Sequence, residues 1–118
     1  MNILELPLKK EWYNLIECGE KREEYREIKP YWTKRLLQDI PFAWHNIRDR
    51  AIETNDCSLF YGKKIPTRYT HVRFRYGYTK RTMLFNLKYI TLGKGNPEWG
   101  APDTEVFIIR LGKRCDMV

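Results

Sequence analysis

The residues best suited to chemistry lie in positions 19–26, Gly-Glu-Lys-Arg-Glu-Glu-Tyr-Arg. Side chains repeat every two residues along a strand, so a strand here would place Glu24 and Arg26 side by side on one face. Lys21 lies at the entry to that strand and can reach over the same patch, although strict alternation would put it on the opposite face. An arginine keeps a neighbouring glutamate ionised, and burial lowers the pKa of a lysine toward that of a general base. Lys21 and Glu24 are therefore the catalytic candidates, and Arg26 and Tyr25 are ligand-binding candidates.

The same charges have two simpler interpretations. Charge runs are commonly solvated surface, and an ion-pair network would serve only to lock a helix against a sheet. This run is mixed in sign and follows directly on an apolar-patterned segment, with another after it and no linker residues between. These features favour a structured cluster over a solvated one.

The elements before and after this segment must position it. Residues 3–6 are short and apolar and predict a first strand, and Pro7 fits the first turn of a helix. That helix would bury one face and end at Gly19, which supplies a left-handed stop. Its predicted buried face includes Trp12, which this pattern assigns to the core; the full face is Leu8, Trp12, Leu15 and Ile16.

After the charged segment, Pro30 opens a second helix and Pro41 closes it. Its buried face is predicted to be Trp32, Leu36, Leu37 and Ile40, with Lys34, Arg35 and Gln38 in water. Residues 41–69 are harder to interpret, because their pattern is weak. This segment is too long for an ordinary connection, so it holds either a helix through Trp44, Ile47 and Ile52 or a functional insertion.

Strands dominate the C-terminal half. Residues 70–76 alternate, with Val72, Phe74 and Tyr76 on one face and His71, Arg73 and Arg75 on the other. Residues 82–91 predict a long strand with Met83, Phe85, Leu87 and Tyr89 on one face, and residues 105–111 predict the last strand. Two early helices and late strands indicate an α+β fold, a small mixed β-barrel with two or three flanking helices.

Two further segments could contact a ligand. Arg73 and Arg75 suit phosphate contact by a sheet, and Lys63 and Lys64 would extend the patch if the fold brings them near; these four are the nucleic-acid-binding candidates. The glycine-rich loop at 93–100 permits close backbone approach, so its Asn96, Glu98 and Trp99 are ligand-binding candidates through hydrogen bonding and stacking. The loop lacks the spacing of a phosphate-binding P-loop.

Composition limits the classes of function. The chain has 118 residues, which suits one domain, and its 22 Lys and Arg against 15 Asp and Glu give a net charge of +7. A basic balance favours anionic partners such as nucleic acid or nucleotides. No apolar run approaches a membrane span and no signal sequence is evident, so we expect a cytoplasmic monomer with no membrane partner. The three cysteines and two histidines show no metal-ligand spacing, and neither a metal nor a cofactor is expected.

The spacing Gly19-x-Lys21-x-x-Glu24-x-Arg26 also resembles the G-x-K-x-x-E-x-R signature of the ASCH domain family. The segments 27–32 (Glu-Ile-Lys-Pro-Tyr-Trp) and 95–100 (Gly-Asn-Pro-Glu-Trp-Gly) and the closing strand resemble one subgroup of it. The family is related to RNA-binding PUA domains. The resemblance implies a single PUA-like domain over residues 1–118, with RNA or a nucleotide-like ligand bound in a cleft formed by the motif.

The resemblance leaves other functions open. Some relatives are amidohydrolases of acetylated cytidine that use a lysine, a threonine and a glutamate. The lysine corresponds to Lys21, but the threonine position holds Glu24, so that chemistry cannot simply be transferred. Other relatives are associated with ribonuclease activity, for which Lys21, Glu24 and Tyr25 are available, with His71 as a single histidine. A hydrolase of a modified nucleoside or of RNA is therefore one alternative, and a protein-interaction module is another.

Overall fold

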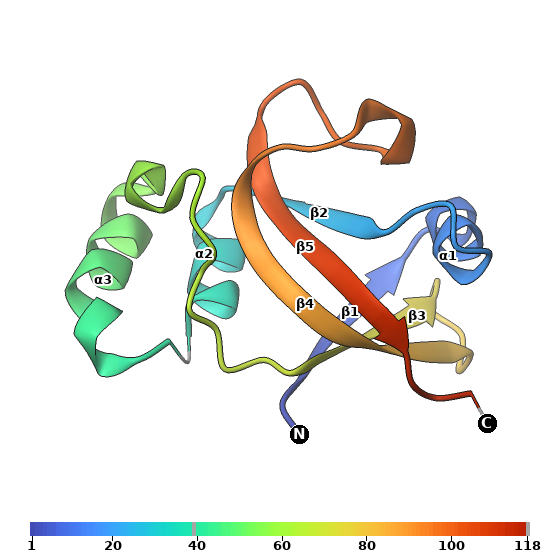
Figure 1. Ribbon diagram of the computed structural model, residues 1–118. Helices are drawn as coiled ribbons and strands as arrows, with labels where there is room; N and C mark the ends of the chain where they lie inside the picture. Colours follow the sequence, from blue (N-terminus) through green and yellow to red (C-terminus); the bar gives the residue numbers. More distant parts are fainter. Residues whose placement is uncertain (39, 118) are drawn as a thin grey trace.

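A computed structural model describes residues 1–38 and 40–117 as a mixed α+β fold with a five-stranded sheet and three α-helices (Figure 1). The predicted α+β class is confirmed. The elements follow the chain in the order β1 (Ile3–Leu8), α1 (Lys10–Glu17), β2 (Glu23–Glu27), α2 (Pro30–Leu36), α3 (His45–Thr54), β3 (His71–Tyr76), β4 (Thr82–Lys94) and β5 (Glu105–Arg114). Short 3-10 turns at Phe42–Trp44, Ser58–Phe60 and Pro97–Trp99 complete the described chain.

The sheet has the strand order β1-β3-β4-β5-β2 and curls into a half-barrel. The β1–β3 pair is parallel, whereas β3–β4, β4–β5 and β2–β5 are antiparallel. The edge strands are β1 and β2, and α1 connects them at one end of the molecule while α2 and α3 lie at the other (Figure 1). The barrel is therefore open along a seam between β1 and β2, which we call the seam.

The main core fills the inside of the curl. Alternate residues of β1 are buried there, and α1 contributes Tyr13 and Ile16. Strand β5 is buried on both faces: Phe107 and Ile109 belong to the main core. Its alternate residues Val106 and Ile108 form a second, smaller cluster with Tyr25 of β2 and Ala101 of the preceding loop, against which Trp99 packs. The loop after β4 thus covers the outer face of β2 and β5.

The prediction that Pro7 opens the first helix is wrong. Strand β1 continues to Leu8, and α1 begins at Lys10. Leu4, Leu6 and Leu8 alternate into the core, and this period of two outweighs the helix-start preference of proline. Pro7 is acceptable because β1 is an edge strand, where a missing N–H leaves no ladder hydrogen bond unmade.

The predicted faces of β4 hold only for its first half. Met83 and Phe85 are buried, but the register with β5 shifts between Phe85 and Leu87 and again between Leu87 and Tyr89. Such bulges change which side chains face the core. Beyond them Ile90 and Leu92 are buried, whereas Tyr89 is only half-buried. A strict alternation through the whole strand misassigns its second half.

The weakly patterned segment 41–69 contains a helix, as one of the two predicted alternatives requires. Helix α3 buries Ala51 against the core, and Trp44 stacks on Phe60 with ring centroids 6.0 Å apart. Helix α2 ends at Leu36, so the prediction that it continues to Pro41 is wrong. Of its predicted apolar face, Leu36 is buried and Trp32 is partly buried, while Leu37 and Ile40 are buried beyond the helix. Arg35 does not point into water, because it donates to the Glu5 carbonyl on β1 at 2.6 Å. Within the described residues, no helix is both long and apolar enough to cross a membrane.

Candidate functional site

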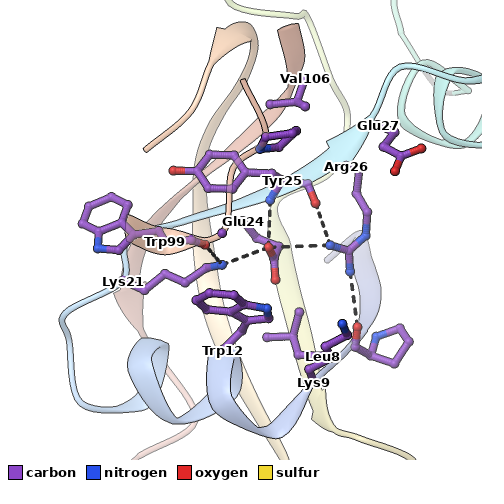
Figure 2. A pocket seen from close by; sticks show the side chains of 13 residues that line it. Leu8, Lys9, Trp12, Lys21, Glu24, Tyr25, Arg26, Glu27, Trp99 and Val106 are labelled. Carbon is purple, nitrogen blue, oxygen red and sulfur yellow. Dashed lines mark hydrogen bonds and ion pairs between the residues drawn. The ribbon is translucent and has the colours of Figure 1, made fainter. Parts of the chain in front are cut away.

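A cleft of about 450 Å³ opens at the seam, and we call it the seam cleft. Strand β1 and the following turn form one wall, β2 forms the second, and the loop after β4 forms the rim (Figure 2). Its lining residues are Pro7, Leu8, Lys9, Trp12, Lys21, Glu24, Tyr25, Arg26, Glu27, Trp99, Gly100, Pro102 and Val106.

The end of α1 brings Lys21 to this cleft. Gly19 adopts φ +89°, its N–H donates to the Ile16 carbonyl at 3.1 Å, and the Lys21 N–H donates to the Leu15 carbonyl at 3.0 Å. These bonds complete the left-handed helix stop that Gly19 predicts. Because β2 begins only at Glu23, strand alternation does not apply to Lys21, and its side chain reaches the same side as Glu24.

The register of β2 explains why Glu24 is buried. Glu24 pairs with Ile109 and Arg26 pairs with Phe107, and both partners belong to the main core. Paired residues share a face of the sheet, so Glu24 and Arg26 point inside the curl, where the seam leaves an opening. Tyr25, between them, pairs with Ile108 and packs in the outer cluster.

Lys21 is only 2% exposed, and its ammonium is surrounded on several sides. Nζ lies 3.2 Å from Glu24 Oε1 and donates to the Trp99 carbonyl at 2.5 Å. It also lies 4.5 Å from the centroid of the Trp12 ring. A cation over an indole face gains electrostatic attraction, so Lys21 ties α1, β2 and the rim loop together.

The two carboxylate oxygens of Glu24 differ in their surroundings. Oε1 faces Lys21 Nζ at 3.2 Å and Arg26 Nη1 at 3.7 Å and accepts the Tyr25 N–H at 2.9 Å. Oε2 has no hydrogen-bond partner in the described chain, although the residue is only 5% exposed. Figure 2 shows the carboxylate, the ammonium and the guanidinium pointing toward one another above Trp12. Glu24 therefore offers one free acceptor inside the cleft.

Arg26 bridges the seam. Its Nη1 donates to the Tyr25 carbonyl at 2.7 Å, and its Nη2 donates to the Pro7 carbonyl on β1 at 3.2 Å. The guanidinium also stacks over Trp32 of α2, 5.0 Å from the ring centroid. Together with the bond from Arg35 to Glu5, these contacts satisfy carbonyls on the open edge of β1. The arginine is thereby fixed in place before any ligand arrives.

Burial shifts the pKa of both cations in the same direction. Removal from water lowers the pKa of Lys21, and the nearby Glu24 carboxylate partly opposes this shift. Burial likewise lowers the pKa of Arg26, again with Glu24 acting in the opposite direction. For Tyr25, burial is the main cause that raises the pKa of the phenol well above its usual range. The site thus combines a buried carboxylate with two partly desolvated cations.

Two glycines allow the rim loop to approach the cleft. A Cβ on Gly100 would lie 2.9 Å from the Trp12 ring, and one on Gly95 would lie 2.4 Å from the Tyr25 ring. The Tyr25 hydroxyl accepts the Asn96 N–H at 3.0 Å and donates to Glu23 at 2.9 Å, which fixes the loop to β2. The backbone of this loop therefore makes the expected close approach, but to the Tyr25 and Trp12 rings of the protein itself.

Five of the predicted site residues line the seam cleft together: Lys21, Glu24, Tyr25, Arg26 and Trp99. Asn96 and Glu98 do not. The Asn96 side chain accepts the Glu98 N–H at 3.0 Å and so caps the turn Pro97–Trp99, and Glu98 is exposed. These two residues shape the rim rather than the interior.

The four basic candidates fall into two separate groups, Arg73 with Arg75 on β3 and Lys63 with Lys64 before it. Arg73 forms an ion pair with Glu5 at 2.5 Å, and Arg75 donates to the Thr79 carbonyl at 2.8 Å. Arg73 is paired with Leu84 of β4, whereas Lys64 bridges to Thr91, seven positions further along the same strand. That separation is roughly 23 Å of strand, so Lys63 and Lys64 do not extend the Arg73–Arg75 patch.

The sequence did not mark Trp12 and Lys9 as site residues. Trp12 was assigned to the core, but it is half-buried and lines the seam cleft beneath Lys21. Its position on the apolar face of α1 is the same for a core residue and for a cleft wall, so periodicity cannot separate the two. Lys9 is exposed at the cleft entrance, in the turn created by the longer β1.

Scans of the chain against protein-family models, curated proteins and solved structures each return no match. The likeness to ASCH domains therefore rests on the residues and spacing of the sequence alone.

Proposed function

We propose that this chain is an ASCH-like, PUA-related domain that binds RNA or a nucleotide-like ligand, with one base in the seam cleft. The proposal joins the G-x-K-x-x-E-x-R spacing to the geometry of its residues. Lys21, in the turn after α1, and Glu24 and Arg26, on one face of β2, line a single cleft. The half-barrel with flanking helices supports the PUA-related assignment at the level of architecture.

The observation that carries the proposal is the free Oε2 of Glu24. A glutamate oxygen is a suitable acceptor for an exocyclic amine or a ring N–H of a base. Within the described residues Oε2 is unpaired in a cleft of about 450 Å³, which is within the range of small-molecule sites. The base would leave water and gain this charge-assisted bond.

Aromatic and basic groups around Glu24 fit the rest of a nucleotide. Trp12 lines the cleft and offers a flat surface for stacking, which is how proteins commonly hold unpaired bases. Trp99 reaches the cleft through its carbonyl, which accepts from Lys21 Nζ, while its ring packs on the outer cluster. Lys9 lies exposed at the entrance and is free to approach a phosphate. Lys21 and Arg26 face the cleft as donors for a base carbonyl.

A hydrolase acting on a modified nucleoside or on RNA is the second candidate. It is favoured by the lowered pKa of Lys21, whose Nζ lies 3.2 Å from Glu24. The lining residues include no serine, threonine or cysteine within the described chain, so water would have to be the nucleophile, activated by Lys21 or Glu24.

The test is isothermal titration calorimetry of the protein with the four nucleosides and their 5′-monophosphates, with product analysis of each mixture by chromatography. Saturable binding of at least one base with the ligand recovered intact supports the binding domain. Turnover that Lys21→Ala abolishes while binding persists supports the hydrolase. No binding and no turnover would contradict both.

A further inference from the structure

A second cavity adjoins the seam cleft beyond the end of β1. It has a volume of about 230 Å³ and is lined by Pro7, Leu8, Lys9, Gly77 and Tyr78. Pro7, Leu8 and Lys9 also line the seam cleft, so the two cavities share one wall. A ligand that leaves the seam cleft over this wall reaches the turn between β3 and β4.

This turn has a bonded backbone and presents Tyr78 fully open to solvent. Tyr78 is 100% exposed. The turn beneath it is well bonded: Gly77 N–H donates to the Leu8 carbonyl at 2.9 Å, and Thr79 N–H donates to the Tyr76 carbonyl at 3.1 Å. The bond to Leu8 attaches the turn directly to the shared wall. Tyr78 is thus an aromatic ring presented at a defined place beside the cleft.

Several cations lie near the second cavity and Tyr78. Lys9 lies on the shared wall, Lys10 lies over the Tyr76 ring at 5.3 Å, and Lys80 follows Tyr78 in the same turn. Arg75 donates to the Thr79 carbonyl at 2.8 Å and adds a fourth positive charge. A phosphate backbone is attracted to such a group of cations.

The opposite end of the seam cleft has the opposite character. A third cavity there shares Glu27, Pro102 and Val106 with the seam cleft and adds Glu105. Glu27 is paired with Lys29 at 3.5 Å, whereas Glu105 forms no ion pair within the described chain. A polyanion entering the cleft is therefore directed toward Lys9 and Tyr78 and away from Glu105.

We propose that Tyr78 is a stacking platform for the base next to the one in the seam cleft, so that the preferred ligand is a single-stranded oligonucleotide. This inference rests on the proposed function of the cleft. A lone exposed aromatic needs no explanation, and Phe42 is 85% exposed as well. Tyr78 differs because its turn is bonded to a wall of the cleft and flanked by cations.

The experiment compares ligands of two lengths by calorimetry and fluorescence anisotropy. The probes are the four nucleoside monophosphates, the four homohexamer RNAs and the matching DNA hexamers. The best hexamer should bind the wild-type chain about 5- to 150-fold more tightly than its own monophosphate, the gain expected from stacking one base. Tyr78→Ala should remove this gain and leave monophosphate binding unchanged, while Phe42→Ala should change neither.

Salt dependence gives a second readout. Lys9→Gln should reduce the slope of log affinity against log salt for the hexamer by about 0.7, the value for one phosphate contact on a single strand. Lys34→Gln, on the exposed side of α2, should leave the slope unchanged. Equal affinity for RNA and DNA hexamers would mean that the base and the phosphate are recognised. A preference for RNA would mean that the ribose hydroxyl is recognised as well. In either case the proposal requires Tyr78→Ala to weaken binding of the hexamer.

The failures can be told apart. If monophosphates bind but hexamers bind no better, or if Tyr78→Ala leaves hexamer affinity intact, the platform is wrong and the cleft function stands. If neither monophosphates nor hexamers bind, both proposals are overturned. Because Tyr78 covers no other residue, Tyr78→Ala should fold normally, and its far-ultraviolet circular dichroism verifies this.

Discussion

Lys21 Nζ lies 3.2 Å from Glu24 Oε1, and both residues are almost completely buried. Two opposite charges removed from water are costly unless their geometry and remaining hydrogen bonds are good. Here Arg26 and the Tyr25 N–H share Glu24 Oε1, and the Trp99 carbonyl and the Trp12 ring share Lys21 Nζ. The pair is therefore part of a network in which removing one charge leaves the other unbalanced.

Removing one member of this ion pair should destabilise the folded chain. Lys21→Met is expected to lower the free energy of unfolding by about 3 kcal/mol, because the buried Glu24 carboxylate loses one of its two cationic partners. Lys29→Met is the matched control: its pair with Glu27 has side chains 51% and 73% exposed and should contribute less than about 1 kcal/mol. Urea denaturation measures both. Equal losses for the two variants would contradict the network.

The pH dependence of stability should reveal the shifted ionisation of Tyr25. Its hydroxyl bonds to Glu23 and Asn96 favour Tyr25 over phenylalanine by about 1–2 kcal/mol at neutral pH. Because the pKa of Tyr25 is raised in the folded chain, this contribution is present below pH 10 and is lost as the pH rises beyond 10, where the unfolded tyrosine ionises first.

The stability difference between the wild type and Tyr25→Phe should therefore shrink above pH 10, as measured by urea denaturation at several pH values. Tyr78→Phe serves as the control at neutral pH and should leave stability unchanged, since Tyr78 makes no hydrogen bond within the described residues. A constant difference across the pH series would show that Tyr25 titrates normally.

The rim loop should tolerate no side chain at Gly100. Gly100→Ala places a Cβ at φ +95° and 2.9 Å from the Trp12 ring, so it should both cost about 1–3 kcal/mol of strain and displace Trp12. Gly62→Ala shares the positive φ but meets no atom within 4 Å. Both variants should lose stability, but only Gly100→Ala should weaken nucleotide binding in calorimetry. Equal binding by the two would mean that Trp12 does not form the cleft wall.

Arg26 should be irreplaceable by lysine. A single ammonium cannot reach the Tyr25 carbonyl, the Pro7 carbonyl and Glu24 together, because it lacks the planar fork of arginine. Arg26→Lys is expected to cost about 2 kcal/mol in urea denaturation, the value of a lost charge-assisted bond. Arg50→Lys, on the exposed face of α3, should cost almost nothing. An unchanged free energy of unfolding in Arg26→Lys would show that the seam does not depend on the contacts of Arg26.

The sequence predicted local structure well where one pattern dominated. The α+β class, the helix opened by Pro30, the stop at Gly19 and the alternating β3 all follow from residue periodicity and backbone preference. Prediction from the sequence failed where two local patterns favoured different structures. Pro7 favours a helix start, yet Leu4, Leu6 and Leu8 alternate, and tertiary packing decided for the strand.

The site was only partly predictable, for a related reason. Spacing along a strand places Glu24 beside Arg26, but only the three-dimensional path of the α1 end places Lys21 there as well. The strand order leaves β1 and β2 as the edges that border the seam, and no local pattern encodes that order. The ion pair between Arg73 and Glu5, which lie 68 positions apart in the sequence, is likewise encoded by no local pattern.

The most direct test of the central claim is the affinity of Glu24→Gln for the nucleoside monophosphate that the wild type binds best. The substitution keeps the shape of the side chain but replaces the carboxylate that supplies the free acceptor Oε2. The account predicts a loss of about 10- to 100-fold, from one hydrogen bond to a charged group, in a variant whose circular dichroism shows it folded. Glu20→Gln, an exposed neighbour, should bind like the wild type. Unchanged affinity in Glu24→Gln would contradict the assignment of the seam cleft as the base-binding site.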